Sequence, residues 1–277
     1  MLTVASLTLR ETQRRRIASI AIVASIVVAA LTAWGFGKLD ASLTSREGAR
    51  AAEAALTILI AFMFSVVLAI GGAFVASSTI AGDVESGIIL AILPRPIARW
   101  AYVVGRWLGL AGAFAVFVAL ANVLEFGAVV VVTGYRPPHP LRALGFLELQ
   151  TLATISLALL CATRLPAIAS GLIAIVAFGL AWTSGVAGSV ATVLHSDAVV
   201  AATTMIGLLI PTDVLWRAAL FDLQPVVYTV AANAAGSRMT NPFGVSGPPT
   251  AASLVWSVLW IASVVAAATI SFGGRDI

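Results

Sequence analysis

The sequence predicts an all-α polytopic membrane protein with six transmembrane helices, organised as a single transmembrane domain over residues 1–277. Its composition, its apolar runs and its cation placement lead to this prediction. Hydrophobic residues make up 60% of the 277 residues and charged residues only 10%, with a mean hydropathy of +1.04. A soluble domain carries about 25% charged residues. Too few polar side chains are therefore present to cover a water-facing surface, and the lipid bilayer is the expected main solvent.

Six segments are apolar enough to cross a membrane, which takes about 20 residues of helix. They are residues 17–36, 55–80, 107–133, 146–162, 167–190 and 251–272. The alternative for the first segment is a cleaved signal peptide, but its apolar run is longer than a signal h-region and no small-x-small site ends it. The stretch DASLTSREGARAAEAAL, which precedes the second segment, is expected to extend that helix outward.

The cations predict the orientation, because arginine and lysine collect on cytoplasmic loops. With the N-terminus inside, the short inner segments carry nine cations and four acids. The cations are Arg10, Arg14, Arg15, Arg16, Arg95, Arg99, Arg106, Arg164 and Arg275. The longer outer segments carry seven cations and seven acids. Both termini are therefore expected in the cytoplasm.

The region 191–250 interrupts the plan of spans. Its apolar run Val199–Ile210 is short for a span, and Pro211 ends it. A re-entrant or interfacial helix suits that length. Were it to cross fully, the chain would have seven spans and an outer C-terminus. The turn-forming stretch 233–249 is expected to be an outer loop.

Residues 2–16 are expected to form an interfacial helix at the membrane surface. Leu2, Ala5 and Leu9 fall near one helical face, and the arginines Arg14 to Arg16 close the segment. A disordered basic tail is the alternative, but the apolar residues of this stretch favour the helix.

The segment 81–100, AGDVESGIILAILPRPIARW, separates the second and third apolar runs. Its residues 83–93 predict a short amphipathic helix, because Asp83 and Glu85 would lie in a first turn where the helix dipole favours anions. The following prolines, Pro94 and Pro96, would end it. Placed between two spans, such a helix would act as a lever, since pushing it would move both.

Several chemistries are excluded by the sequence. The only lysine is Lys38, and Leu39 follows it, so the phosphate-binding pattern G-x-x-x-x-G-K-[S/T] does not occur. The patterns H-E-x-x-H, G-x-S-x-G and C-x-x-C are also missing. The chain has one cysteine, Cys161, and two histidines, which are too few for a thiolate or histidine metal cluster. No metal site and no catalytic residue is therefore expected.

One carboxylate falls within a predicted span. Glu125 lies one helical turn from Asn122, so the two share a face. An ionisable group in hydrocarbon is costly and is a candidate functional residue by default. These two residues are therefore candidates for lining a translocation path or holding a proton. The alternative, a protonated or hydrogen-bonded carboxyl in a helix–helix interface, stays open.

The segment 81–106 resembles the cytoplasmic segment of ABC-2 type permeases, the membrane subunits of type V ABC transporters. The family pattern there is E-x-G-[ST], a proline about seven residues on, and [YL]-x-x-G-[KR]. The matching residues are Glu85, Gly87, Leu90, Pro94, Tyr102, Gly105 and Arg106. Ile88 stands where threonine is common, and Arg106 where lysine is common.

Three further stretches resemble the same family, so the likeness extends over the whole chain. LTLRETQRRR is similar to the R-x-E-L start, with Arg10, Glu11 and Arg14 in the segment. IPTDVLWRA at 210–218 is similar to the segment before the last span, and FGGRDI to the family's end. The 210–218 stretch also resembles the permease of nitrous-oxide-reductase maturation systems.

The resemblance implies a non-catalytic permease subunit of an ATP-driven exporter in the plasma (inner) membrane of a prokaryote. Residues 2–16 would be its connecting helix and residues 83–93 its coupling helix. Residues 191–216 would be outer re-entrant helices. The residues implied to couple to the ATPase are Asp83, Glu85, Gly87, Leu90, Pro94, Arg95 and Arg99. ATP and Mg²⁺ would be bound by a separate cytoplasmic ATPase subunit, and this chain would need no cofactor.

The working unit implied by the resemblance contains two permeases, identical or different, and two ATPases, with no nucleic acid partner. Few charges in an apolar bundle suit an amphipathic or hydrophobic substrate. Two other functions stay open: a gradient-driven carrier that uses Glu125, and a membrane scaffold that transports nothing.

Overall fold

In the computed structural model of the chain, the described residues are 3–8, 23, 26–27, 29–31, 33–35, 46–89, 98–224, 245 and 247–275. The side chains of 46–57, 60, 133, 192 and 193 are outside this description. The principal helices are α3 (Arg46–Glu85), α5 (Arg99–Thr133), α6 (Pro140–Ala162), α7 (Ala167–Val193), α8 (Asp197–Leu209), α9 (Thr212–Leu223) and α11 (Ala251–Gly273). The described part of the chain is all helix and loop, as the composition predicts.

The predicted spans agree well with these helices. Five helices in the described residues are long and apolar enough to cross a membrane: α3, α5, α6, α7 and α11. They coincide with five of the six predicted segments, and α3 begins at Arg46 because the preceding outer stretch extends it, as predicted. The remaining segment, 17–36, lies mostly outside the described residues. The chain is therefore a membrane protein with several apolar helices.

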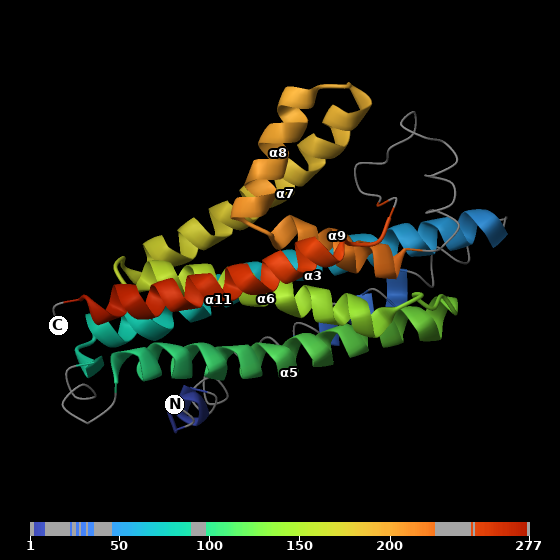
Figure 1. The fold of residues 1–277 in the computed structure, drawn as a ribbon. Helices are drawn as coiled ribbons and strands as arrows, with labels where there is room; N and C mark the ends of the chain where they lie inside the picture. Colours follow the sequence, from blue (N-terminus) through green and yellow to red (C-terminus); the bar gives the residue numbers. More distant parts are fainter. Residues whose placement is uncertain are drawn as a thin grey trace.

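Helix α6 lies at the centre of the bundle. It contacts α3, α5, α7, α9 and α11, and Figure 1 shows it running alongside α3, α5 and α11. Its buried face is rich in small residues, including Ala153, Ser156 and Ala158. Small side chains let helix backbones approach closely, which is how membrane helices pack when lipid removes the hydrophobic drive.

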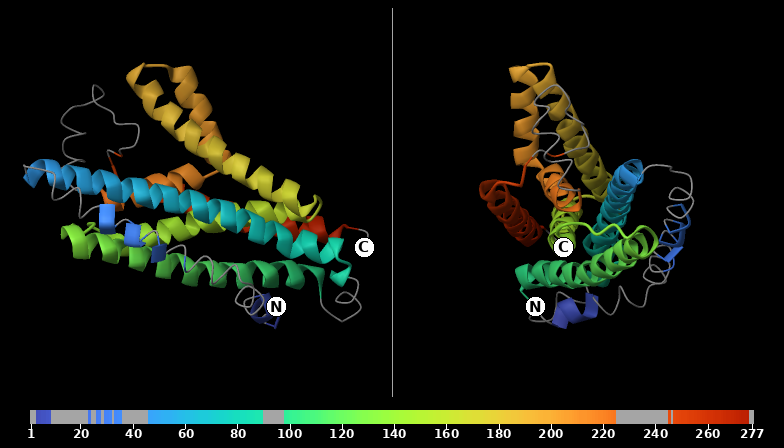
Figure 2. Two further views of the ribbon diagram at one scale, coloured as in Figure 1. Left: turned by 180° about the vertical axis from the view of Figure 1, so that it is seen from behind. Right: turned by 90° about the vertical axis from the view of Figure 1, so that its right-hand side faces the viewer.

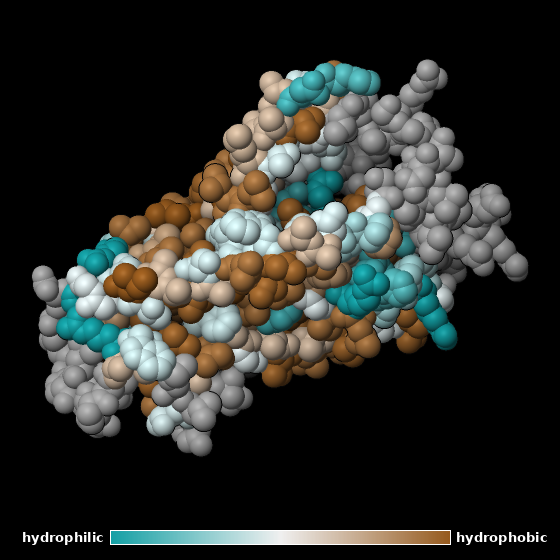
Figure 3. Space-filling view, in the orientation of Figure 1, coloured by the Kyte–Doolittle hydropathy of each residue, from teal (hydrophilic) through white to brown (hydrophobic). Residues whose placement is uncertain are grey.

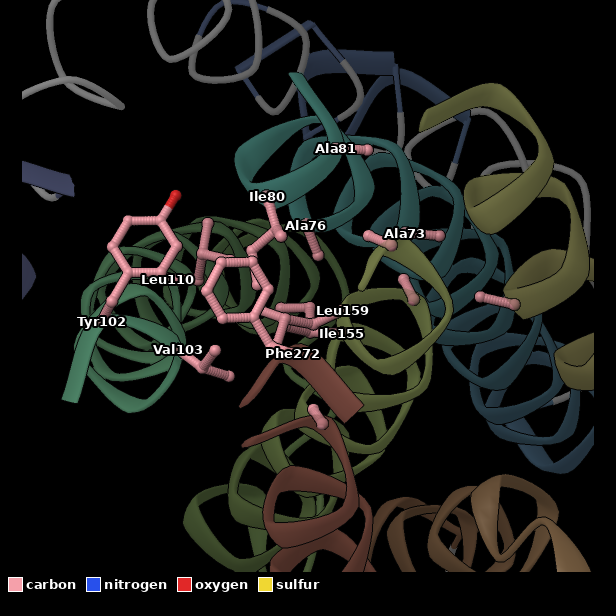
Figure 4. Close-up of a cluster of buried hydrophobic side chains, with 14 of the residues drawn as sticks. Ala73, Ala76, Ile80, Ala81, Tyr102, Val103, Leu110, Ile155, Leu159 and Phe272 are labelled. Carbon is pink, nitrogen blue, oxygen red and sulfur yellow. The ribbon is translucent and has the colours of Figure 1, made fainter. Parts of the chain in front are cut away.

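A core cluster joins five helices, α3, α5, α6, α7 and α11, at one end of the bundle. Figure 4 shows Tyr102 and Leu110 from α5 pointing toward Ile80 of α3, Ile155 of α6 and Phe272 of α11. The rings of Tyr102 and Phe272 stack with their centroids 5.5 Å apart. We call this end the arginine end, because α3 and α11 end there, α5 and α7 begin there, and arginines stand at several of these helix termini.

The helices α7 and α8 form a hairpin that leaves the bundle at an angle (Figures 1 and 2). The turn between them contains His195, whose φ of 54° ends α7 in the left-handed region. Within the hairpin, Gly188 faces Thr203 so closely that an added Cβ would lie 2.9 Å from its Oγ1. The two helices of the hairpin therefore pack closely at Gly188.

The predicted short helix over 199–210 is present as α8, and Pro211 follows it. A second short helix, α9, continues after a bend of 95°. The bend lies at Ile210, whose backbone is extended at φ −139° and ψ 91°. Because proline lacks an N–H and fixes its own φ, it favours a break at this position.

The surface of the bundle is apolar along its length. Figure 3 shows hydrophobic residues over much of the bundle, with hydrophilic residues gathered toward its ends and at the tip of the α7–α8 hairpin. Val131 and Ile168 are 85% and 77% exposed. At 35 residues, α5 is about 52 Å long, so it extends beyond a hydrocarbon core of about 30 Å.

Candidate functional site

The candidate site lies at the arginine end, where α3 ends and α5 begins. Asp83 of α3 is ion-paired with Arg106 of α5, and Tyr102 Oη donates a hydrogen bond of 2.5 Å to Asp83 Oδ2. Both charged side chains are about nine-tenths buried. A buried carboxylate needs such partners, because an unpaired charge out of water is expensive. These contacts among Asp83, Tyr102 and Arg106 therefore hold the end of α3 and the start of α5 in one arrangement.

This arrangement corrects the prediction that Asp83 and Glu85 begin a helix over 83–93. Both residues lie in the last turn of α3, which runs without a break from Arg46 to Glu85. A helix C-terminus disfavours anions, but the Arg106 guanidinium neutralises Asp83 from another helix. The local pattern of charges predicted that a helix begins at Asp83. A helix can end there instead, because Arg106, 23 residues later in the sequence, neutralises the Asp83 carboxylate.

Glu85 does serve a helix start, but that of another helix. Its Oε1 accepts a hydrogen bond of 3.1 Å from the backbone N–H of Ala167, the first residue of α7. The residue before it, Pro166, offers no side-chain cap. A carboxylate at a helix N-terminus satisfies a backbone donor and interacts well with the dipole. Glu85 therefore joins the end of α3 to the beginning of α7.

Gly87 ends α3 geometrically. Its φ of +73° lies in the left-handed region, which residues with a side chain rarely adopt. Its N–H donates to the carbonyl of Val84 at 3.1 Å. The next two residues differ in exposure: the Ile88 side chain is 51% exposed, whereas Ile89 is 1% exposed and belongs to the core cluster. The predicted coupling residues Leu90, Pro94 and Arg95 lie outside the described residues.

Arg99 is the first residue of α5. Its Nη1 donates to the carbonyls of Gly273 and Arg275, at 3.1 and 2.7 Å, at the end of α11. A guanidinium at a helix C-terminus satisfies unpaired carbonyls and interacts favourably with the dipole. The residues on both sides of the segment 86–98 are therefore held in place: the end of α3 by contacts to α5 and α7, and the start of α5 by contacts to α11.

The start of the chain packs on this same site. Residues 3–8 are helical, and Thr8 is buried with its Oγ1 3.3 Å from Arg106 Nη1. The close approach is possible because Gly109 lies beneath it: an added Cβ would be 2.6 Å from Thr8 Cβ. Ala5, which lies on the apolar helical face predicted from the sequence, is half-buried. The remaining predicted residues, Arg10, Glu11 and Arg14, lie outside the described residues.

The other candidate pair lies farther along α5. Asn122 and Glu125 are both buried, at 3% and 4% exposure, so they share an inward face as predicted. Asn122 Nδ2 donates to the carbonyl of Val118, 2.8 Å away in its own helix. The structure therefore separates these two from the arginine-end residues.

Polar contacts that the sequence analysis missed lie on α6 and α9. Gln150 accepts a bond from Ser65 of α3 at 2.7 Å and donates to the carbonyl of Thr212 at 3.2 Å. Asp213 is ion-paired with Arg217 at 2.7 Å and lies directly against Gly185 of α7. The only signal in the sequence was the four-residue spacing of Asp213 and Arg217.

Among the described residues, no group of three or more histidine, cysteine, aspartate or glutamate side chains is arranged to hold a metal ion. Comparisons of the sequence with protein-family models and with curated proteins find no match. The arrangement of charged helix ends is suited to transmitting movement between helices, because each contact crosses from one helix to another.

Proposed function

We propose that this chain is the permease subunit of an ABC-2 type (type V) ABC transporter, which exports an amphipathic or hydrophobic substrate. ATP would be hydrolysed by a separate cytoplasmic ATPase subunit, which would also bind Mg²⁺. Two permeases, identical or different, would form the path. The chain would lie in the plasma (inner) membrane of a prokaryote with both termini in the cytoplasm.

One observation carries the proposal: the residues that flank the segment 86–98 in sequence make charged contacts that join four helices, α3, α5, α7 and α11. Asp83 and Arg106 join α3 to α5, Glu85 joins α3 to α7, and Arg99 joins α5 to α11. Force applied to such a segment is passed to all of these helices, since packed elements move as units. We call the segment 86–98 the handle, because an external motor needs a segment through which its movement reaches several helices.

The other elements take roles that suit the same proposal. The helix at residues 3–8 packs on Gly109 beside the handle and would be the connecting helix at the inner leaflet. The bent pair α8 and α9 would be the outer re-entrant unit, because two short helices joined at a 95° bend suit a segment that enters the membrane and turns back. Within the whole sequence, the single lysine at 38 leaves ATP hydrolysis to another chain.

The exposure of the coupling residues supports different roles for them under this proposal. Asp83 is buried and its carboxylate is engaged by two α5 side chains, so its part in coupling would be to hold the segment in place. Ser86 and Ile88 are exposed on the handle and are better placed to touch a partner. Glu85 and Gly87 contribute the cap of α7 and the turn.

The test is co-purification of the chain with an ATP-binding-cassette ATPase from a neighbouring gene of the same genome, together with the ATPase rate. The variant Ile88→Gln removes an exposed apolar contact from the handle without touching its anchors. Ile168→Gln is the matched control, since Ile168 is exposed at the same end on α7. We expect the first variant to weaken association and the control to leave it unchanged. Absence of association for the wild-type chain would refute the proposal.

A gradient-driven carrier is the second candidate, and the burial of Glu125 beside Asn122 in α5 favours it. A buried carboxyl within a span is a suitable proton site. Substrate flux driven by a pH gradient without any ATPase, and lost in Glu125→Gln, would support this candidate. Flux that needs the ATPase and persists in Glu125→Gln would exclude it.

A further inference from the structure

Three arginines from separate places in the sequence converge on the last turn of α11. Arg99 bonds to the carbonyls of Gly273 and Arg275. Arg164, in the turn after α6, donates from Nε to Ser271 Oγ at 3.1 Å and from Nη2 to the Ser271 carbonyl at 2.8 Å. Arg275 Nη1 donates to the carbonyl of Thr163 at 2.7 Å. We call Arg99, Arg164 and Arg275 the arginine triad.

These contacts use only part of the hydrogen-bonding capacity of the triad. A guanidinium carries five N–H donors, and within the described residues Arg99 and Arg275 each bond through Nη1 alone, and Arg164 through Nε and Nη2. No free nitrogen of Arg99 or Arg275 is buried, and Arg164 is exposed. The remaining donors therefore reach the surface while the main-chain contacts hold the guanidinium groups in position.

The charge of the triad is not balanced by the described acids. None of the three forms an ion pair with a carboxylate in the described part of the chain. The nearby Asp83 is paired with Arg106, and Glu85 accepts from the backbone of Ala167. Asp276 follows Arg275 in sequence and lies outside the described residues. Glu85 keeps its negative charge, because its hydrogen-bond donor is a neutral backbone N–H. Counting Glu85 and Asp276, three positive charges stand beside two negative charges here.

Exposed apolar side chains flank each member of the triad in the sequence. Trp100 beside Arg99 is 54% exposed, Leu165 beside Arg164 is 39% exposed, and Ile270 in the last turns of α11 is 76% exposed. Hydrophilic residues gather around the end of α11 next to hydrophobic ones (Figure 3). A ligand for this surface therefore combines a negative head with an apolar body.

We propose that the arginine triad binds the phosphate headgroup of an anionic phospholipid at the membrane surface. Guanidinium groups recognise phosphate through paired, charge-assisted hydrogen bonds, and basic sites between membrane helices hold lipid headgroups in this way. The acyl chains would lie along the exposed apolar side chains. An acidic protein surface fits less well, because it would leave Trp100 and Ile270 facing water.

The test uses the full chain purified alone, so that it does not depend on any ATPase. The probes are phosphatidylglycerol and phosphatidylcholine in nanodiscs, with binding of labelled phosphatidylglycerol and the unfolding temperature as readouts. The main variant is Arg99→Gln/Arg164→Gln/Arg275→Gln, which keeps a donor at each position but removes the charge. Arg136→Gln is the matched control, since Arg136 is an exposed arginine of the α5–α6 connection.

We expect phosphatidylglycerol to bind the wild-type chain and raise its unfolding temperature above that in phosphatidylcholine. Each charge removed should weaken binding roughly fivefold, while the control should bind as the wild type does. Should the triple variant not fold, Arg164→Gln alone tests the same point, because that side chain is exposed.

Three results would overturn the proposal. One is equal phosphatidylglycerol binding by the triple variant and the wild type. Another is an equal loss of binding in Arg136→Gln, which would show only general charge attraction. The third is an equal stabilisation by inorganic phosphate, which would show an anion site that does not require a lipid.

Discussion

The carboxylate of Asp83, at the end of α3, is ion-paired with the guanidinium of Arg106, two turns into α5. The pair is buried, Tyr102 donates to the same carboxylate, and Thr8 of the N-terminal helix lies within hydrogen-bond distance of the guanidinium. A buried ion pair is weak evidence for stability, since desolvation offsets much of the attraction. Its main effect here is on geometry, because it defines how three elements meet at the base of the handle.

Removing one partner of this pair should be strongly destabilising. Asp83→Asn leaves Arg106 buried without a counter-charge, and we expect the free energy of unfolding to fall by about 3–5 kcal/mol. Unfolding of the purified chain in detergent measures the change. Arg106→Gln should cost a similar amount, and the double variant less than the sum of the two. Strict additivity would show that the two side chains do not interact.

The Glu85 cap predicts a local effect on α7. Glu85→Ala removes the acceptor of the Ala167 N–H, and loss of an N-terminal cap costs about 1 kcal/mol. We expect faster amide hydrogen exchange in residues 167–171, with little change elsewhere in α7. Ser86→Ala is the control, because Ser86 Oγ bonds only within its own turn, to the carbonyl of Gly82. Equal exchange in both variants would argue against the cap.

The contact between α7 and α9 predicts that Gly185 does not tolerate a side chain. A Cβ at this position would overlap the carboxylate of Asp213, which is itself held by Arg217. We expect Gly185→Ala to lower stability by about 1–3 kcal/mol, the usual cost of overpacking. Gly179→Ala, on the same helix with open space at its Cβ, should be neutral or slightly stabilising. A thermal-unfolding comparison of the two variants checks this.

The N-terminal helix should detach when Gly109 is enlarged. In Gly109→Ala the new methyl group would lie 2.6 Å from Thr8 Cβ and 2.8 Å from the Ala5 carbonyl. We expect residues 3–8 to become more accessible to a protease, and ATPase coupling to weaken if the proposed function holds. Gly112→Ala meets no neighbouring atom within 4 Å and should cleave like the wild type. Unchanged cleavage in Gly109→Ala would contradict the packing.

The positions of the long apolar helices were predicted correctly from the sequence, because the thickness of the bilayer sets a minimum length for a helix that crosses it. Runs such as 107–133 and 251–272 must be helical, because hydrocarbon leaves backbone groups no other partner, and α5 and α11 cover them. The turn at Pro211 was also predictable, since proline cannot continue the helical hydrogen bonds. Helix boundaries were less well predicted: α5 begins at Arg99, eight residues before the apolar run.

The prediction of a helix start at Asp83 was wrong for a physical reason. Acids beside a glycine and ahead of prolines satisfy the local rules for either a helix beginning or a loop. Choosing between these and a helix end needs knowledge of the neutralising partner, and Arg106 comes 23 residues later in the sequence. The same holds for Glu85, whose partner Ala167 is 82 residues away.

The sequence by itself determined that this chain is a membrane protein. It also determined where its apolar helices lie and that arginines stand near several of their ends. Those properties depend on the composition and on the length of each apolar run, and both can be read directly from the sequence. Only the tertiary structure decided that Arg99, Arg164 and Arg275 surround one helix end, that Asp83 is neutralised and that Glu85 caps α7. Charges act over a few ångströms of space, and which charges come that close is set by how the helices pack.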